Sequence, residues 1–94
     1  MDVVGIGRIY KFIQKHLDSK SWLEAWLAEV RAKDWQSPND IKKKYKSASI
    51  LEDNKVIFNV KGNKYRMEVQ VTFKTKVIVI KRIGTHSEYD RWAL

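Results

Sequence analysis

The 94-residue chain is long enough for one domain with a modest hydrophobic core and too short for a core plus a separate functional module. Hydrophobic residues make up 44% of the chain, which excludes an intrinsically disordered protein. Cysteine is absent, which excludes disulfides, thiolate nucleophiles and thiolate metal sites. We therefore expect residues 1–94 to form a single domain.

The net charge of +8 is unevenly distributed along the chain. Residues 1–35 carry six Lys or Arg against five Asp or Glu, whereas residues 36–94 carry thirteen against six. The basic second part favours a polyanionic partner such as nucleic acid, although charge alone fits a solubilising surface equally well. No apolar run reaches the ~18 residues that span a bilayer, and cations interrupt the first twenty residues, unlike a signal peptide. We expect a cytoplasmic protein without a membrane partner.

Two amphipathic helices are predicted in the N-terminal third, after a short edge strand at Val3 and Val4. Residues 6–17 place apolar side chains three and four positions apart, with cations between them. A second helix, capped by Ser19 or Ser21, should present one wide apolar face made of Trp22, Leu23, Trp26, Leu27 and Val30. Because the polar faces mix both charges, they disfavour a membrane-surface role. We expect this helical hairpin to cover a sheet.

A third, short helix is predicted to begin at Pro38. Ser37 is a suitable N-cap, proline is favoured at the first helical position, and Asp40 places an acid in the first turn. The helix should run through Ile41 and Tyr45 and end in a lysine-rich turn, where cations are electrostatically favoured.

From Lys55 onward the apolar residues alternate with polar ones. Two alternating runs flank Gly62-Asn63, which predicts a β-hairpin with a two-residue turn. That turn would place Asn59 opposite Arg66 and Lys61 opposite Lys64. One face of the hairpin is then apolar and belongs to the core. The other face collects Lys55, Asn59, Lys61, Lys64, Arg66, Glu68 and Gln70.

A further strand and a short helix complete the chain. Residues 77–83 are apolar on both faces until Lys81 and Arg82, as expected of a central strand. The turn before this strand carries no strong signal, so the sequence leaves open which of these two cations points to the polar face. Thr85 to Glu88 is a capping box that starts the final helix. The whole pattern predicts an α+β fold, with N-terminal helices on one face of a small antiparallel sheet and the other face open.

The polar sheet face is suited to binding phosphate. Each Lys or Arg contact with a phosphate releases counterions, and Arg can bind two oxygens at once. Arg66 is the strongest candidate, because we expect Glu68, two residues along the same strand, to orient its guanidinium. The alternative for Arg66 is an exposed ion pair with Glu68, worth a few tenths of a kcal/mol.

His86 and Tyr89 are the other candidates for chemistry. His86 lies in the first turn of the final helix, where free N–H groups attract anions, and Tyr89 and Asp90 follow on the same side. Tyr89 offers a ring for base stacking or a phenol for proton transfer, or simply seals the helix onto the sheet. His16, on the polar side of the first helix, is interpreted as a surface residue. Without cysteine or paired histidines, neither a metal site nor a cofactor is expected.

Segments 56–66 and 84–90 together resemble the HigB branch of the RelE-type toxins, and the resemblance extends from the first helix to the C-terminus. It implies the RelE-like fold and a toxin of a bacterial type II toxin–antitoxin system. Such toxins cleave mRNA, commonly in the ribosomal A site, and are neutralised by a cognate antitoxin, here expected to be a helix-turn-helix protein. Arg66 matches the catalytic arginine of that family, and His86 with Tyr89 matches its motif near the end of the chain.

Other matches to the family are weaker. Asn59 and Lys64 match less closely, and either Lys81 or Arg82 stands where relatives carry an arginine near the end of the last strand. The implied reaction is a metal-free attack of the RNA 2′-OH on its adjacent phosphate. Arg66 would stabilise the phosphorane, His86 would transfer a proton, and Tyr89 would transfer a proton or stack. The residues expected to bind the RNA backbone are Lys55, Asn59, Lys61, Lys64, Lys81 and Arg82.

Three alternatives remain open at the level of sequence. The same face could hold RNA without cleaving it, or a toxin with the same fold could act on DNA gyrase instead. A structural subunit could also use the basic face to bind an acidic partner. Growth arrest and transcript cleavage on expression would separate the first, DNA damage with intact transcripts would identify the second, and loss of RNA binding at moderate salt would support the third.

Overall fold

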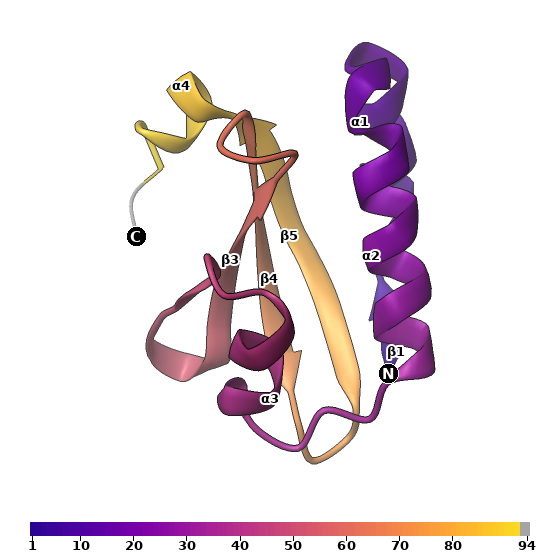
Figure 1. Cartoon of the computed structure of the whole chain (residues 1–94), viewed down its shortest axis with the longest axis vertical. Helices are drawn as coiled ribbons and strands as arrows, with labels where there is room; N and C mark the ends of the chain where they lie inside the picture. The colour runs from indigo at the N-terminus through magenta and orange to yellow at the C-terminus, as the bar shows by residue number, and fades with distance from the viewer. Residues whose placement is uncertain (93–94) are drawn as a thin grey trace.

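The computed structural model describes residues 1–92 and is an α+β structure (Figure 1). Its α-helices are α1 (Ile6–Lys15), α2 (Lys20–Ala32), α3 (Pro38–Lys44) and α4 (His86–Tyr89), with 3₁₀ turns η1 (Leu17–Ser19) and η2 (Glu52–Asn54). Its strands are β1 (Asp2–Val4), β2 (Ser49–Ile50), β3 (Lys55–Val60), β4 (Tyr65–Thr72) and β5 (Val77–Thr85). Figure 1 shows α1 and α2 along one side of the sheet and α4 on the other.

The strands form one sheet in the order β1-β5-β4-β3-β2. The predicted antiparallel arrangement is correct for β3, β4 and β5, and β2, which was not predicted, also pairs antiparallel with β3. The prediction is wrong for β1, which pairs with β5 in parallel, Asp2 opposite Val77. A parallel pair needs a long connection, and the helices and the β-hairpin between β1 and β5 supply it. The strand predicted as central, β5, indeed lies between two neighbours, β1 and β4.

The predicted register of the β3–β4 hairpin is confirmed, with Asn59 opposite Arg66 and Val60 opposite Tyr65. Its turn is longer than predicted: β3 ends at Val60, and residues 61–64 form a loop closed by a 3.3 Å hydrogen bond from Lys64 N to Lys61 O. Lys61 and Gly62 have φ values of +52° and +67°, so the chain leaves the extended conformation one residue before the glycine. The expected strand pair between Lys61 and Lys64 is therefore part of the loop.

A β-bulge in β5 decides the open question about the two cations near its end. Glu68 pairs with Arg82, whereas the next residue of β4, Val69, pairs with Ile80, so Lys81 is the extra residue. Arg82 therefore shares a face with Glu68. The side chain of Lys81 is exposed at the bulge.

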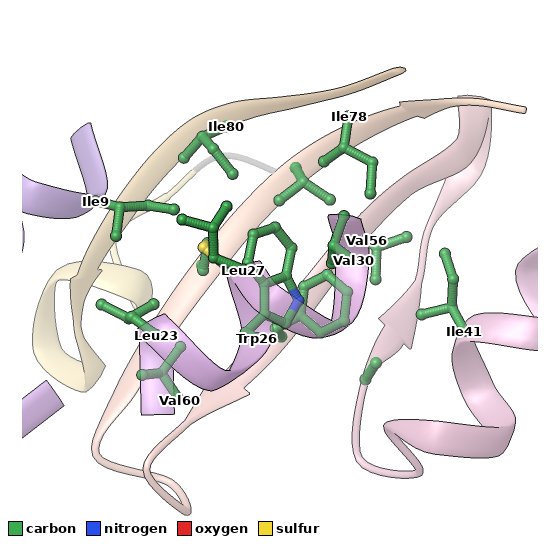
Figure 2. Close-up of a cluster of buried hydrophobic side chains, with 14 of the residues drawn as sticks. Ile9, Leu23, Trp26, Leu27, Val30, Ile41, Val56, Val60, Ile78 and Ile80 are labelled. Carbon is green, nitrogen blue, oxygen red and sulfur yellow. The ribbon is translucent and has the colours of Figure 1, made fainter. Parts of the chain in front are cut away.

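One hydrophobic core fills the space between the helices and the sheet (Figure 2). The face of the hairpin predicted to be apolar is buried in full, including Phe58 and Met67 at 1% and 0% exposure. Trp26 of α2 packs edge-on against Phe58, with ring centroids 5.4 Å apart. Figure 2 shows where the remaining groups meet: Leu23, Leu27 and Val30 of α2, Ile9 of α1, Ile41 of α3, Val56 and Val60 of β3, and Ile78 and Ile80 of β5.

The helix boundaries differ from the prediction mainly at the end of α1. That helix stops at Lys15 instead of residue 17, because His16 leaves the helical region (φ −137°, ψ 74°) and η1 follows. Ser19 occupies the N-cap of α2, but its hydroxyl donates to the carbonyl of His16 at 2.7 Å instead of accepting from the helix. The short helix α3 begins at Pro38 as predicted and ends at Lys44. No helix within residues 1–92 has the length and apolar character needed to cross a membrane.

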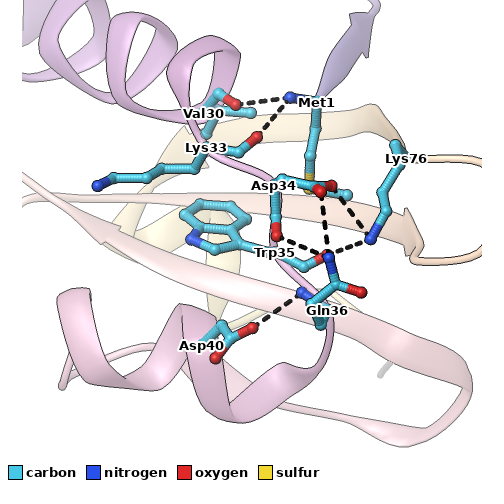
Figure 3. Close-up of polar contacts among 8 residues, drawn as sticks. All are labelled: Met1, Val30, Lys33, Asp34, Trp35, Gln36, Asp40 and Lys76. Carbon is cyan, nitrogen blue, oxygen red and sulfur yellow. Dashed lines mark hydrogen bonds and ion pairs between the residues drawn. The ribbon is translucent and has the colours of Figure 1, made fainter.

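Polar contacts fix the connection between α2 and α3 (Figure 3). The N-terminal ammonium of Met1 donates to the carbonyls of Val30 and Lys33 at 2.9 and 2.8 Å, where the last carbonyls of a helix favour a cation. Lys76, in the β4–β5 turn, contacts the carboxylate of Asp34 and the carbonyl of Trp35, both at 3.1 Å. This end of the molecule is thus tied to the sheet, at the opposite end of β5 from α4.

Candidate functional site

Arg66 of β4 is the centre of the candidate site, and its side chain is buried, with 8% of the residue exposed. Its Nη1 donates to the carbonyl of Asn63 at 2.8 Å and to that of Tyr65 at 3.2 Å. Within residues 1–92, its Nε and Nη2 donate no hydrogen bond. The guanidinium carbon lies 5.2 Å from the centroid of the Tyr89 ring, within the range of a cation–π interaction. The structure therefore brings Arg66 and Tyr89 together, and two carbonyls fix the guanidinium.

Glu68 does not orient Arg66, contrary to the prediction. Its carboxylate accepts a 2.8 Å hydrogen bond from Nε of Arg82, which lies directly opposite on β5. A directly opposed side chain is closer than one two positions along the same strand, so the cross-strand pair prevails. Glu68 is also buried, at 6% exposure, which makes it a fixed support for Arg82.

The final helix begins with the predicted capping box. The Thr85 hydroxyl accepts from the backbone N–H of Glu88 at 3.2 Å, and the Glu88 carboxylate accepts from the N–H of Thr85 at 2.9 Å. The hydrogen bond from the backbone N–H of Thr85 holds the pKa of Glu88 below its usual range. His86 and Asp90 lie on one side as predicted, with 3.4 Å between Nδ1 and Oδ2. The His86 ring is 6.5 Å from that of Tyr89, and its side chain is 54% exposed.

The sheet face opposite the helices is not open at this end, which corrects the second part of the fold prediction. Tyr89 lies over Arg66, and the Trp92 ring lies 4.5 Å from the guanidinium carbon of Arg82 and 5.4 Å from the Tyr89 ring. Gly84, opposite Arg66 on β5, allows this cover: a Cβ there would come within 3.0 Å of the Trp92 ring. The capping box turns the chain back over the sheet, and the aromatic rings shield the arginines.

The lysines predicted to share the face of Arg66 are distributed differently. Lys64 and Lys61 instead pair with Asp18 of η1, Lys64 through a short hydrogen bond and Lys61 at 3.8 Å. The left-handed conformation at Lys61 ends the strand alternation, so the loop side chains reach toward the turn between α1 and α2. Lys55 and Asn59 are on β3 as predicted, and Asn59 bonds to the Asn63 side chain at 3.3 Å, with no hydrogen bond to Arg66.

Asp18 is strongly stabilised in its charged form. Besides Lys64 and Lys61, it accepts a 2.6 Å hydrogen bond from the hydroxyl of Tyr65. The hydrogen bonds from Lys64 and Tyr65 lower the pKa of Asp18 to about 2. The same bonds raise the pKa values of Lys64 and Tyr65. This cluster anchors the hairpin loop to the helical layer.

Comparison with known families identifies the fold and its class of function. The family model described as HigB_toxin, the RelE-like toxic component of a toxin–antitoxin system, matches residues 19–92. The chain belongs to the HigB toxin family. No curated protein matches the sequence significantly. Membership in the HigB family makes this chain the toxin of a toxin–antitoxin system, which has a cognate antitoxin as its partner.

The matched segment of this HigB-family toxin contains Arg66, Arg82, His86 and Tyr89, whereas α1 lies outside it. Sequence reasoning missed Trp92, Gly84 and Asp18 as part of this region. A tryptophan six residues after His86 was a weak signal that aromatic rings lie over Arg66 and Arg82. Asp18 carried no such signal, because its hydrogen-bond partners, Lys64 and Tyr65, are 46 and 47 residues away. Among residues 1–92, no three His, Asp or Glu side chains gather as a group that could hold a metal ion.

Proposed function

We propose that this HigB-family toxin is an endoribonuclease that cleaves mRNA in the cytoplasm, on the ribosome, and so inhibits translation. Residues 1–94 would act as one domain, and a helix-turn-helix antitoxin would neutralise it. The observation that carries the proposal is the grouping of Arg66, Arg82, His86 and Tyr89 where β5 ends and α4 begins, with Trp92 in contact with both Tyr89 and Arg82. The ring of Tyr89 lies 5.2 Å from the Arg66 guanidinium carbon and 6.5 Å from the His86 ring, so a group for charge stabilisation and a group for proton transfer flank one side chain.

The proposed reaction is a transesterification without a metal. The RNA 2′-OH attacks its adjacent phosphorus, the bond to the 5′-oxygen breaks, and the products are a 2′,3′-cyclic phosphate and a 5′-OH. Arg66 would donate from its unbonded N–H groups to the phosphorane oxygens, where positioned donors act most strongly. Arg82, held by Glu68, would provide the second phosphate contact.

His86 is the proposed proton-transfer residue. Its Nδ1 faces Asp90 at 3.4 Å, which leaves Nε2 available to a substrate, and its exposed ring can reach bound RNA. Tyr89, beside both His86 and Arg66, would stack on a base or transfer the second proton. Lys55, Asn59 and Lys81 remain proposed contacts to the RNA backbone, whereas Lys61 and Lys64 could contribute only by exchanging Asp18 for phosphate.

The test compares Arg66→Ala and Arg66→Lys with Arg31→Ala, which removes an exposed arginine of α2. Cleavage of mRNA by translating ribosomes should fall by about 10² to 10³ for Arg66→Ala, because a transition-state contact is lost. Arg66→Lys should retain only part of the activity, since lysine lacks the planar guanidinium group that can donate two hydrogen bonds to one phosphate. Circular dichroism confirms folding. Full cleavage by a folded Arg66→Ala would reject the assignment, and intact transcripts with the wild type would reject the endoribonuclease.

A further inference from the structure

A groove between α1 and the end of β5 adjoins the candidate site and shares Arg82 with it. It has a volume of about 260 Å³ and includes Arg8, Lys11, Lys15 and His16 of the α1 region and Arg82 and Glu88 from the end of the sheet and α4. Within residues 1–92, the edge strand β1 pairs only with residues 77–79 of β5, so the last residues of β5 have no neighbouring strand on this side. Beyond β1, α1 therefore borders the free edge of β5 and forms the other wall of the groove.

The charge of this groove is strongly positive and largely unneutralised. Arg8, Lys11 and Lys15 lie on one face of α1 at spacings of three and four residues, and all three are exposed. Within residues 1–92, none of them forms an ion pair. Among the described residues, Glu88 is the one acid in the lining, and its carboxylate already accepts the hydrogen bond from Thr85. The groove thus offers free cations to an anionic ligand.

The spacing of the three cations fits a nucleic-acid strand. At 1.5 Å per residue, Arg8 and Lys15 are about 10.5 Å apart along α1. Each of the three cations can therefore contact a different phosphate of a single strand that runs along the groove. Arg82 lines the groove and also belongs to the candidate site, so a strand in the groove would lie next to that site.

The lining favours RNA over a protein partner. Its apolar residues are Phe12, which is buried at 8% exposure, and Ile83, which is half-buried. A stable protein interface needs an apolar centre that excludes water, and this groove offers little of one. A chain of phosphates requires only cations at regular intervals.

We propose that the groove between α1 and β5 binds the phosphate backbone of the RNA strand whose adjoining segment occupies the candidate site. This inference rests on the proposed function, because it assumes that RNA is the substrate. Arg8, Lys11 and Lys15 neutralise about three phosphates, and Arg82 marks the point where the strand passes from the groove to Arg66 and His86.

The test uses a fluorescently labelled twelve-nucleotide RNA with 2′-O-methyl groups, which binds but cannot undergo attack by the 2′-oxygen. Its affinity is measured by anisotropy between 50 and 200 mM salt for the wild type and for the triple variant Arg8→Gln, Lys11→Gln, Lys15→Gln. The matched control neutralises three exposed lysines elsewhere, Lys43→Gln, Lys46→Gln, Lys74→Gln. Glutamine preserves helix propensity in α1, and circular dichroism verifies the fold.

Loss of three phosphate contacts should reduce the slope of log affinity against log salt by about 2 for the groove variant. The wild type should therefore lose about 20-fold more affinity than the groove variant over this salt range, and the control should behave as the wild type. The proposal would be overturned if the groove variant and the wild type had the same salt slope, or if both triple variants changed equally. It would also be overturned if the wild type did not bind RNA. Polyglutamate serves as a second probe in the same assay. If the groove variant lost polyglutamate binding but kept the salt slope of the wild type for RNA, the proposal would be overturned in favour of an acidic protein segment.

Parallel cleavage of unmodified mRNA separates this proposal from the proposed function. If the wild type binds RNA through the groove but leaves mRNA intact on the ribosome, the endoribonuclease is rejected and the groove stands. If the wild type cleaves mRNA while the groove variant retains the full salt slope, the groove is rejected and the endoribonuclease stands.

Discussion

Gly84 shows how a single residue shapes the candidate site. It lies opposite Arg66 in the β4–β5 pair, where any side chain would point into the cover formed by α4 and Trp92. A Cβ atom would lie 3.0 Å from the Trp92 ring and 3.1 Å from Cβ of Glu88. The missing side chain lets the aromatic cover approach the sheet closely enough to contact Arg66 and Arg82.

Replacement of this glycine should therefore weaken the fold. Gly84→Ala forces Trp92 or the start of α4 to move, and overpacking of this kind costs about 1 to 3 kcal/mol. The free energy of unfolding in urea measures the loss. Gly7→Ala is the matched control, because no atom of residues 1–92 lies within 4 Å of a Cβ there and alanine favours α1 by up to about 1 kcal/mol. Equal stability of Gly84→Ala and the wild type would show that Trp92 does not pack here in solution.

Side-chain partners across the sheet were predictable only where the register was known. The alternation of residues and the Gly62-Asn63 pair were enough to place Asn59 opposite Arg66. The partner of Glu68 was missed because the register of β5 depends on a bulge that has no local signal. The position of Arg82 therefore required the structure.

At the scale of elements, the short helix α4 determines how much of the sheet face is accessible. Four residues cannot form a stable helix alone, so α4 depends on its capping box and on its contacts with β4 and β5. The backbone N–H of His86 adds a 3.2 Å hydrogen bond to the carbonyl of Lys64 in the hairpin loop. Loss of the cap should release the cover from Arg66 without unfolding the core.

Thr85→Ala tests this dependence, because it removes the side chain that accepts from Glu88. A lost N-cap costs about 1 kcal/mol, and here the cost should be local to α4. Hydrogen exchange should accelerate several-fold at the amides of residues 86–92 and remain unchanged in β3 and β4. Ser87→Ala, at an exposed position of the same helix with no side-chain hydrogen bond to residues 1–92, is the control. Unchanged exchange in Thr85→Ala would mean that packing alone holds α4.

The elements themselves were largely predictable, whereas their ends and the cover were not. Alternation identified β3 and β4, an apolar run identified β5, helical periodicity identified α1 and α2, and the start signal at Ser37 and Pro38 identified α3. The sequence pattern of β1 could not show its parallel pairing, since that depends on how the chain returns after α1. The cover over Arg66 arises from packing of Tyr89 and Trp92, which sequence separation from β4 conceals.

At the scale of the molecule, the loop 61–64 connects three layers. Its lysines pair with Asp18 of the helical layer, its Asn63 carbonyl accepts from Arg66 of the sheet, and its Lys64 carbonyl accepts from His86 of α4. A change in the helical layer at Asp18 can therefore affect the position of the catalytic candidates. This connection also makes the stability of the molecule depend on pH.

The pH prediction follows from the lowered pKa of Asp18, about 2 in the folded chain against 3.8 without its partners. Asp18 should stabilise the fold fully above pH 4, and its contribution should disappear as the pH falls toward 2. Asp18→Asn should therefore be less stable than the wild type at pH 7 and nearly equal to it at pH 2. Urea midpoints across this range measure the difference, with Glu24→Gln on the exposed side of α2 as control. A constant difference between pH 7 and pH 2 would contradict the prediction.

The extra residue in β5 interrupts the regular alternation of side chains between the two faces of the sheet. Ile78 and Ile80 face the core before it, and Ile83 returns to the core after it, because Lys81 absorbs one step. The segment from Arg82 to Trp92 contains every residue of the candidate site except Arg66. This segment follows directly after the bulge. Deleting Lys81 would make Ile80 and Arg82 neighbours, so Arg82 would stay opposite Glu68 and Ile83 would stay on the core side, in a ladder without the bulge.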